Sequence, residues 1–289
     1  MGESLNKEIQ LLTKPGSFLG VRSRAAGCCV ALFILSAAGL KADVLAYAGS
    51  DTGIFGMMDL NTGAFTALGN SGQTLAGLAV ANGSIFASSY HTANGTLFTV
   101  NPSNGALTNI GTATGIDYDD FGSTTSGLYV VSFGSTQDLY SINPLTGAAT
   151  LIGPTGLGYG SWRSLSTNAG VLYFADGADL YTLSTSTGAA TLVGAFGGSA
   201  EMGALLLEGG VLYGGDDVNN KLDTISVVTG VATTGPSPSA SFTGSTYGLA
   251  PFPVPEGTTT PEPGTCALLG GGLTALALLQ RRMRKGAGK

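Results

Sequence analysis

The sequence is poor in charged residues, and its long middle part is almost without positive charge. Charged residues make up 10% of the 289 residues. Between Asp43 and Pro263 there are 16 acidic residues and only two basic ones, Arg163 and Lys221, which leaves a net charge of −14. Such a segment repels phosphates, so we expect no nucleic-acid partner. The apolar share of 43% is still large enough to build a buried core.

Cysteine is absent from the same segment, because Cys28, Cys29 and Cys266 lie near the two ends. This excludes a disulfide framework, a zinc–thiolate site and a catalytic thiol there. The single histidine, His91, has no triad partner at a recognisable spacing. No phosphate-binding loop, dinucleotide fingerprint or nucleophile elbow is visible. We therefore expect no cofactor.

Calcium is the one cation that the sequence leaves open. Asp216 and Asp217 precede two asparagines in a predicted loop, but they lack a complete oxygen-ligand motif. A solvated turn is the default interpretation for this pair, and Ca²⁺ binding is the alternative.

The first 42 residues are typical of a signal peptide. Arg22 and Arg24 precede an uncharged run over 25–40, with small residues at Ala37, Ala38 and Ala42 near its end. A positive flank, a short apolar core and a small-residue exit are what signal peptidase requires. We predict cleavage after Ala42, with Ala38 as the second choice and an uncleaved anchor as the alternative.

The C-terminal end has three parts in a fixed order. Pro261, Glu262, Pro263 and Gly264 close a Pro/Thr-rich linker over 253–264. An uncharged segment over 265–280 follows, about 24 Å long as a helix and therefore slightly short for a bilayer core. A basic tail over 281–289 then carries the membrane-stop residues Arg281, Arg282, Arg284 and Lys285, which the positive-inside rule keeps in the cytoplasm.

This end resembles the PEP-CTERM sorting signal over about the last 30 residues. The resemblance implies that an exosortase, an integral-membrane cysteine transpeptidase, cleaves near Pro261–Pro263 and delivers the protein to the cell surface or matrix. It also implies a bacterium that makes exopolysaccharide, which becomes a candidate partner beside signal peptidase and the general export machinery. A plain single-span anchor is the alternative.

The middle of the chain contains a repeat of about 42 residues. Similar segments begin at residues 54, 97, 139, 180 and 222, and the copies over 139–153 and 180–194 are nearly identical. This period is typical of a β-propeller blade. Each copy is a predicted hairpin, and a second hairpin lies between successive copies, so we expect four antiparallel strands per blade.

The sequence therefore predicts an all-β fold, a five-bladed propeller over 43–252, flanked by an N-terminal signal helix and a short C-terminal transmembrane helix. One inner hairpin is split between the ends of the domain: residues 247–250 match its first strand and 44–47 its second. Pairing these two strands would close the ring and remove both sheet edges. An open solenoid or a sandwich is the rival fold.

Aligning the inner strands places Asp119 and Arg163 at one level, with Asp117 and Glu201 two residues earlier on the same strand face. We expect these four residues at one channel mouth, where ion pairs tether neighbouring blades; the alternative is a polar pocket for a cation or a sugar. The alignment predicts that Trp162 belongs to the core, and a platform for a sugar ring is the alternative.

Two functional classes remain. The first is a non-enzymatic surface or matrix component that binds other polymers through its propeller. The second is a propeller enzyme, such as a lyase, lactonase or glycan hydrolase, that uses channel carboxylates. The scarcity of His, Lys and Arg favours the first class, because general acids and oxyanion donors have few candidates.

Overall fold

The computed structural model describes residues 43–89, 95–124, 127–158, 160–168 and 170–252. The signal peptide predicted over 1–42, the linker, the span predicted over 265–280 and the basic tail lie outside these ranges. Within the described ranges, the search for a helix long and apolar enough to cross a membrane finds none.

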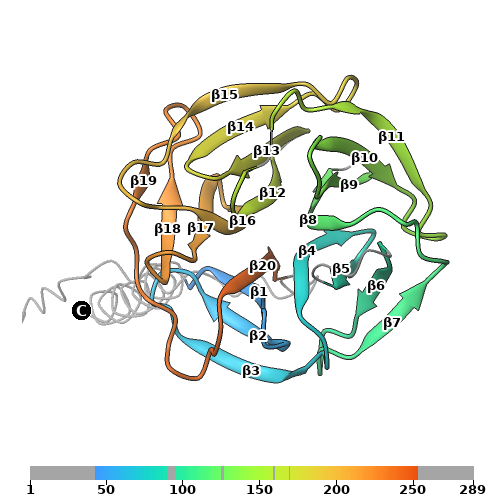
Figure 1. Cartoon of the computed structure of the whole chain (residues 1–289). Helices are drawn as coiled ribbons and strands as arrows, with labels where there is room; N and C mark the ends of the chain where they lie inside the picture. The colour runs from blue at the N-terminus through green and yellow to red at the C-terminus, as the bar shows by residue number, and fades with distance from the viewer. Residues whose placement is uncertain (1–42, 90–94, 125–126, 159, 169, 253–289) are drawn as a thin grey trace, which may run out of the picture. The chain divides into compact units, whose positions relative to one another are not determined.

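The chain forms five four-stranded antiparallel sheets arranged around a central axis, as the sequence repeat predicts (Figure 1). Blade 1 is β20(Thr246–Pro251), β1(Leu45–Ser50), β2(Ile54–Asp59) and β3(Phe65–Asn70). Blade 2 is β4(Leu75–Ala81), β5(Ser84–Ser89), β6(Leu97–Val100) and β7(Leu107–Ile110). Blade 3 is β8(Tyr118–Thr124), β9(Gly127–Ser132), β10(Asp138–Ile142) and β11(Ala149–Pro154). Blade 4 is β12(Arg163–Asn168), β13(Val171–Asp176), β14(Asp179–Leu183) and β15(Ala190–Ala195). Blade 5 is β16(Met202–Glu208), β17(Val211–Asp216), β18(Lys221–Ile225) and β19(Ala232–Thr233).

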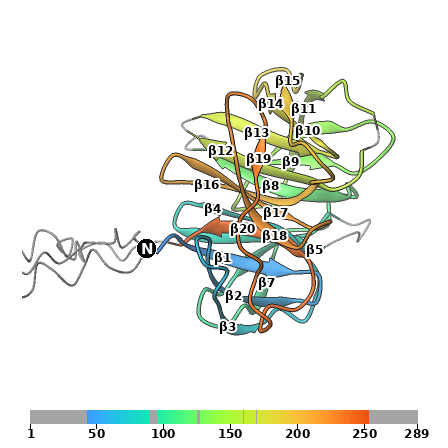
Figure 2. The same ribbon diagram turned by 90° about the vertical axis from the view of Figure 1, so that its left-hand side faces the viewer.

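The ring is closed by its two ends, which confirms the split blade. β20 is the innermost strand of blade 1 and pairs with β1, with Tyr47 opposite Ala250 and Ala48 opposite Leu249. The inner strands β20, β4, β8, β12 and β16 pack side by side in a closed circle. β1 begins and β20 ends on the same side of the propeller (Figure 2). Closure thus depends on one pair of strands from opposite ends of the domain.

The turn between the third and fourth strand has the same chemistry in every blade. In blade 3 the Asn143 side chain accepts hydrogen bonds from the backbone N–H of Leu145 and Thr146, at 2.9 and 3.2 Å. Gly147 then adopts a φ of 72° and donates its N–H to the Asn143 carbonyl. A capping side chain followed by a glycine with positive φ closes such a turn without strain. The repeated Asn, Ser or Asp and the Gly that follows it are therefore turn residues.

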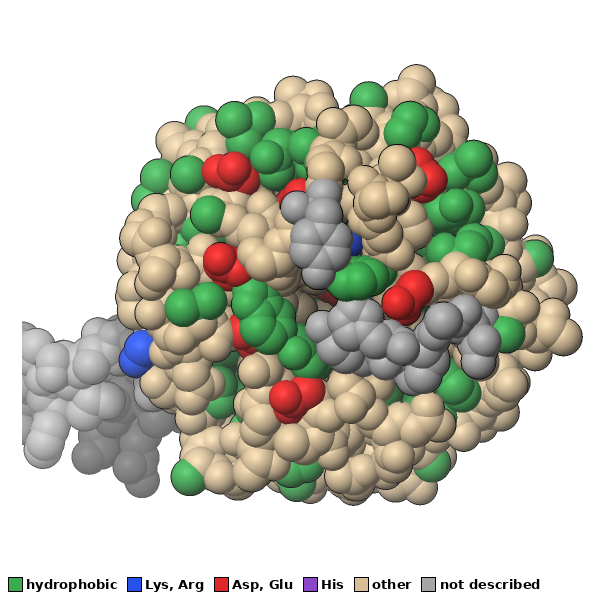
Figure 3. Space-filling view, viewed as in Figure 1, with side chains coloured by type: hydrophobic (Ala, Val, Ile, Leu, Met, Phe, Trp, Pro, Cys, Tyr) green, Lys and Arg blue, Asp and Glu red, His purple; other side chains and the backbone are tan. Residues whose placement is uncertain are grey.

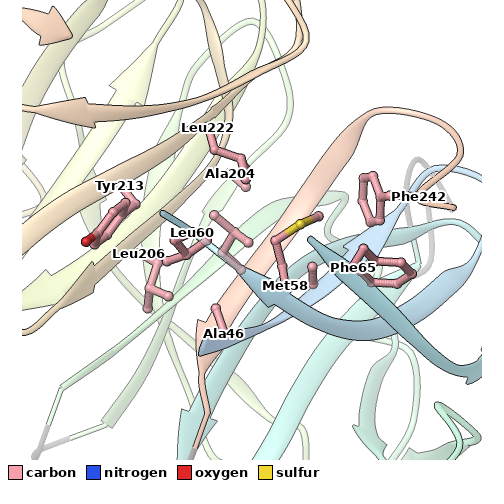
Figure 4. Packing of buried hydrophobic residues seen from close by; sticks show 11 residues of the cluster. Ala46, Met58, Leu60, Phe65, Ala204, Leu206, Tyr213, Leu222 and Phe242 are labelled. Carbon is pink, nitrogen blue, oxygen red and sulfur yellow. The ribbon is translucent and has the colours of Figure 1, made fainter. Parts of the chain in front are cut away.

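The hydrophobic core lies between blades. Figure 4 shows the cluster where blade 5 meets blade 1: Met58 and Phe65 come from blade 1, whereas Leu206 and Tyr213 come from blade 5. Four further clusters fill the other contacts between the blades. Because each blade buries its apolar faces only against its neighbours, the ring is stable only as a whole.

Glycines bring the backbones of neighbouring blades into direct contact at the rim. Gly188, in the last turn of blade 4, lies against Gly153 of blade 3, and a Cβ atom added to Gly188 would stand 2.2 Å from the Gly153 carbonyl oxygen. Gly194 and Gly230 repeat this contact between blades 4 and 5. The glycines of the repeat are therefore required by inter-blade contact as well as by turn geometry.

We expect Gly188→Ala to lower the free energy of unfolding by about 1–3 kcal/mol more than Gly156→Ala, because only the first substitution forces two blades apart. Gly156 is a matched control, since its φ of 80° is close to the 82° of Gly188 but no atom lies within 4 Å of its added Cβ. Urea unfolding of both variants measures the difference. Equal losses of stability would mean that the rim contact contributes nothing beyond backbone strain.

Candidate ligand site at the acidic mouth of the propeller

The charged residues are concentrated on one face of the ring. We call the face where the five inner strands begin the upper face, and the face where β1 begins the lower face. Ten of the 14 acidic residues in 43–252 lie at strand ends and loops of the upper face. They are Asp51, Asp117, Asp119, Asp120, Asp138, Asp176, Asp179, Glu201, Asp216 and Asp217. In Figure 3 acidic side chains surround the centre of the face turned to the viewer.

The inner strands differ in register at this mouth, and the sequence alignment missed the difference. β8 and β16 shift register near their first residues, between Tyr118 and Phe121 and between Met202 and Ala204. β12 pairs with β13 without a shift from its first residue, Arg163. Arg163 therefore lies level with Tyr118 and Met202, and the predicted alignment of Arg163 with Asp119 is one residue out.

The same register places Trp162 at the mouth. Its ring packs on that of Tyr247, with centroids 5.4 Å apart and planes inclined by 31°. Blade 5 separates the blades that carry these two residues, so the pair lies across the mouth. Trp162 is half-buried and does not belong to the buried core, so the prediction of a core tryptophan was wrong.

Arg163 joins blades 3 and 4. Its guanidinium lies over the Phe133 ring of blade 3, 4.4 Å from the centroid, and its Nε is 3.9 Å from Oδ1 of Asp176 in blade 4. Arg163 is 6% exposed, so this cation–π contact is largely shielded from water. Gln137 of blade 3 donates to Oδ2 of Asp176 at 3.1 Å and also to the Gly158 carbonyl. The Phe133 contact and the Gln137 hydrogen bond cross from blade 3 to blade 4, whereas the Arg163–Asp176 ion pair lies within blade 4. Sequence reasoning missed Phe133, Gln137 and Asp176.

Asp117 and Glu201 each come one residue before an inner strand, at the level of Trp162. Both are partly exposed at the mouth. Their backbones hold the neighbouring loops: the Asp117 carbonyl accepts the N–H of Phe133 at 2.8 Å, and the Glu201 carbonyl accepts that of Asp217 at 3.2 Å. The Asp119 side chain lies outside the described part of the structure.

A further inter-blade tether comes from Asp120, which the sequence did not single out. Its Oδ2 accepts the N–H of Leu165 in the next blade at 2.9 Å, and its Oδ1 accepts the N–H of Phe121. Asp120 is buried and lies against Gly77 of blade 2, where a Cβ would stand 1.9 Å from Oδ1. Three blades thus meet at one carboxylate. The only sequence signal was a charged residue inside an inner strand.

Asp216 and Asp217, the weak calcium candidates, have structural roles. Oδ1 of Asp216 accepts the N–H groups of Val218 and Asn219, both at 3.1 Å, as in a capped turn. Oδ1 of Asp217 accepts the N–H of Thr246, at 3.0 Å, on the closing strand β20. Across the described residues, no group of three or more His, Cys, Asp or Glu side chains is arranged to hold a metal ion.

Burial raises the pKa of Asp217 from 3.8 to about 8, and the charges of Asp51 and Asp216 add to this effect. Its Oδ2 is buried without a hydrogen-bond partner. The folded protein therefore retains a proton on this carboxyl that the unfolded chain releases near pH 4. A carboxyl of this kind opposes folding increasingly as the pH rises from about 4 to 8.

The channel below the mouth is narrow, and its lining includes serine as well as leucine and phenylalanine. A cavity of about 40 Å³ lies among side chains of all five inner strands, with Leu78, Phe121, Leu165, Leu205 and Leu249 in its lining. A space of this size has room for a water molecule or two but not for a sugar ring. A ligand of that size does not fit inside this cavity.

We predict that the stability of the protein falls as the pH rises from 4 to 8, and that Asp217→Asn makes this dependence shallower. The amide retains the acceptor for the Thr246 N–H but carries no ionisable proton. Burial also raises the pKa values of Asp176, Asp223 and Glu208, so part of the slope should remain. Thermal melts at half-unit pH steps test this, with the exposed Asp43→Asn as control. A slope unchanged in Asp217→Asn would contradict the assignment.

Comparison with known proteins leaves the chain without an assigned family. No protein-family profile and no curated protein matches it. Among solved structures, a chain from the crystal structure of a nidogen/laminin complex aligns with a TM-score of 0.47 and 11% identity, over 71% of this chain and 97% of that one. The chain is therefore described by its own architecture, a five-bladed β-propeller with four antiparallel strands per blade.

Proposed function

We propose that the protein is an exported bacterial surface or matrix protein, sorted by its C-terminal Pro-Glu-Pro signal, whose propeller binds a polymer without catalysis. The observation that carries the sorting is the order of Pro261–Gly264, the uncharged segment 265–280 and the basic tail. In this scheme the basic residues hold the chain in transit while an exosortase cuts near Pro263.

The mouth supports a binding role for the propeller. Trp162 and Tyr247 offer aromatic surface beside partly exposed carboxylates, and sugar rings pack on such surface while their hydroxyls donate to carboxylates. Negative charge on the upper face disfavours acidic polymers. We therefore infer a neutral or amine-bearing polysaccharide as the ligand, in keeping with the link to exopolysaccharide that the sorting signal implies.

The surroundings of Arg163 favour binding over catalysis. This residue is the arginine of the propeller, and it is buried between Phe133 and Asp176. It therefore serves the structure and is poorly placed to stabilise a charged intermediate. An enzyme that uses a carboxyl pair is the alternative, and the raised pKa of Asp217 beside Asp51 is the feature that favours it.

The sorting proposal predicts a difference between hosts. In a host with an exosortase, we expect a released species that lacks the residues after about Pro263, because the enzyme cuts the extended Pro-Glu-Pro segment. In a host without the enzyme, we expect the chain to stay membrane-bound. Mass spectrometry of membrane and medium fractions measures both, with Glu262→Ala as the matched variant. Full-length protein held in the membranes of both hosts would identify a plain anchor.

The binding proposal predicts a change in tryptophan fluorescence. Trp162 is the single tryptophan of the chain, so its emission reports directly on the mouth. We expect a saturable change in Trp162 emission with a neutral glucan or with chitosan, and no change with a polyuronate. The Tyr247→Ala variant should bind about tenfold more weakly, because it removes one stacking contact of about 1–3 kcal/mol. Absence of any response would contradict the binding role, whereas release of reducing ends would indicate an enzyme.

A further inference from the structure

The lower face differs from the mouth in charge. Its acidic residues are Asp43, Asp59 and Glu208, and among the residues that the structure describes it carries no Lys or Arg. Asp59 is nearly buried, and its carboxylate accepts hydrogen bonds from the Asn61 N–H and the Thr62 hydroxyl. Burial raises the pKa of Glu208, which further weakens the negative charge on this face. The described lower face is thus only weakly acidic, whereas the upper face is strongly acidic.

Exposed apolar side chains are also concentrated on the lower face. Leu145 and Val228 occupy the same position in the last turns of blades 3 and 5 and are 85% and 80% exposed. Val171, Val211 and Val231, at lower strand ends of blades 4 and 5, are exposed to a lesser degree. A groove of about 390 Å³ between Val211 and Val228 continues this apolar region, and we call these five residues the lower apolar patch.

The chain leaves the propeller on this same face. β20 ends at Pro251 on the lower side, and 12 residues, 253–264, separate it from the uncharged segment 265–280. Twelve residues reach at most about 40 Å when fully extended. If the segment 265–280 is inserted in the membrane, as the proposed function requires, the lower face is held close to the lipid surface.

We propose that the lower apolar patch rests on the phospholipid headgroup layer while the chain is membrane-bound, so that the acidic mouth points away from the membrane. This inference rests on the proposed function. Separate apolar tips such as Leu145 and Val228 suit a soft lipid interface, into which each can insert alone. The smaller number of acidic residues on this face reduces the repulsion that the acidic upper face would meet at anionic lipids.

A second copy of the chain fits the patch less well than a lipid surface does. A stable protein interface buries about 800 Å² on each partner with close shape complementarity. The five apolar residues lie on three blades, and the turn of blade 4 between the two tips carries the polar Ser186 in the corresponding position. Such a discontinuous patch binds weakly in solution. The linker raises the effective concentration of the patch at the lipid surface, so a weak contact can form there.

The test uses the chain that signal-peptide cleavage would leave, residues 43–289, reconstituted in phosphatidylcholine vesicles with Cys266 replaced by alanine. A single cysteine at Leu145 or Val228 carries an NBD fluorophore, and one at Val218, 49% exposed on the upper face, is the matched control. We expect a blue-shifted emission at positions 145 and 228 that spin-labelled lipid quenches at least twofold more than at position 218. The double variant Leu145→Ser/Val228→Ser, labelled at position 231, should lose most of this quenching.

The outcomes separate this inference from the proposed function. A chain that floats with the vesicles but shows water-like emission at positions 145 and 228 overturns the lipid contact and leaves sorting intact. A blue shift that grows with protein density and is insensitive to the lipid quencher identifies a second copy and also overturns it. A chain that does not float contradicts membrane insertion itself, and the inference fails with it.

Discussion

The structure depends on the close contact of neighbouring blades. No blade has a core of its own, since each cluster of buried side chains is shared across a boundary, as with Met58 and Leu206. At the rim the contact is backbone to backbone, where Gly153 meets Gly188 and Gly194 meets Gly230. Neighbours this close exclude water from the side-chain clusters between them. The fold is consequently cooperative around the whole ring, and the pairing of β20 with β1 completes it.

The same contact determines where polar residues can lie. Carboxylates at the mouth lie at blade boundaries, where Asp120 accepts the N–H of Leu165 and Asp217 accepts that of Thr246. In each case a glycine on an adjacent inner strand, Gly77 or Gly203, provides the space for the carboxylate. Both carboxylates hold neighbouring blades together through hydrogen bonds from backbone N–H groups. Burial also raises the pKa of Asp217 and so limits its charge at neutral pH. Much of the acidity of the upper face therefore belongs to the architecture and not to a ligand site.

The fold could be predicted from the sequence because the sequence repeats with a blade-sized period. A repeat of about 42 residues, two hairpins per repeat and a split blade predict the number of strands, the number of blades and the closure, without any side-chain detail.

The site was harder to predict from the sequence, because the level of each side chain at the mouth depends on strand register. The irregular pairing in β8 and β16 leaves an extra residue that hydrophobic alternation alone does not reveal, and β12 lacks it. One residue of shift moved Trp162 from the expected core to the mouth and separated Arg163 from the level of Asp119. The partners Phe133 and Asp176 come from loops and strand ends, where no pattern indicated a contact.

A propeller of five blades also restricts where function can lie. With five inner strands the central space is small, and leucine and phenylalanine side chains fill it down to a cavity of about 40 Å³. Binding at the axis is therefore limited to the two faces. These faces differ in their charge and in the apolar and aromatic side chains that they expose. The upper face combines many acidic residues with an aromatic pair. The lower face has few acidic residues, bears exposed valine and leucine side chains, and carries the end of β20. Because closure requires that β1 begin and β20 end together, a linker after residue 252 must leave from the lower face. The acidic mouth thus lies on the face opposite to the end of β20, which is the arrangement that the proposed receptor for an external polymer requires.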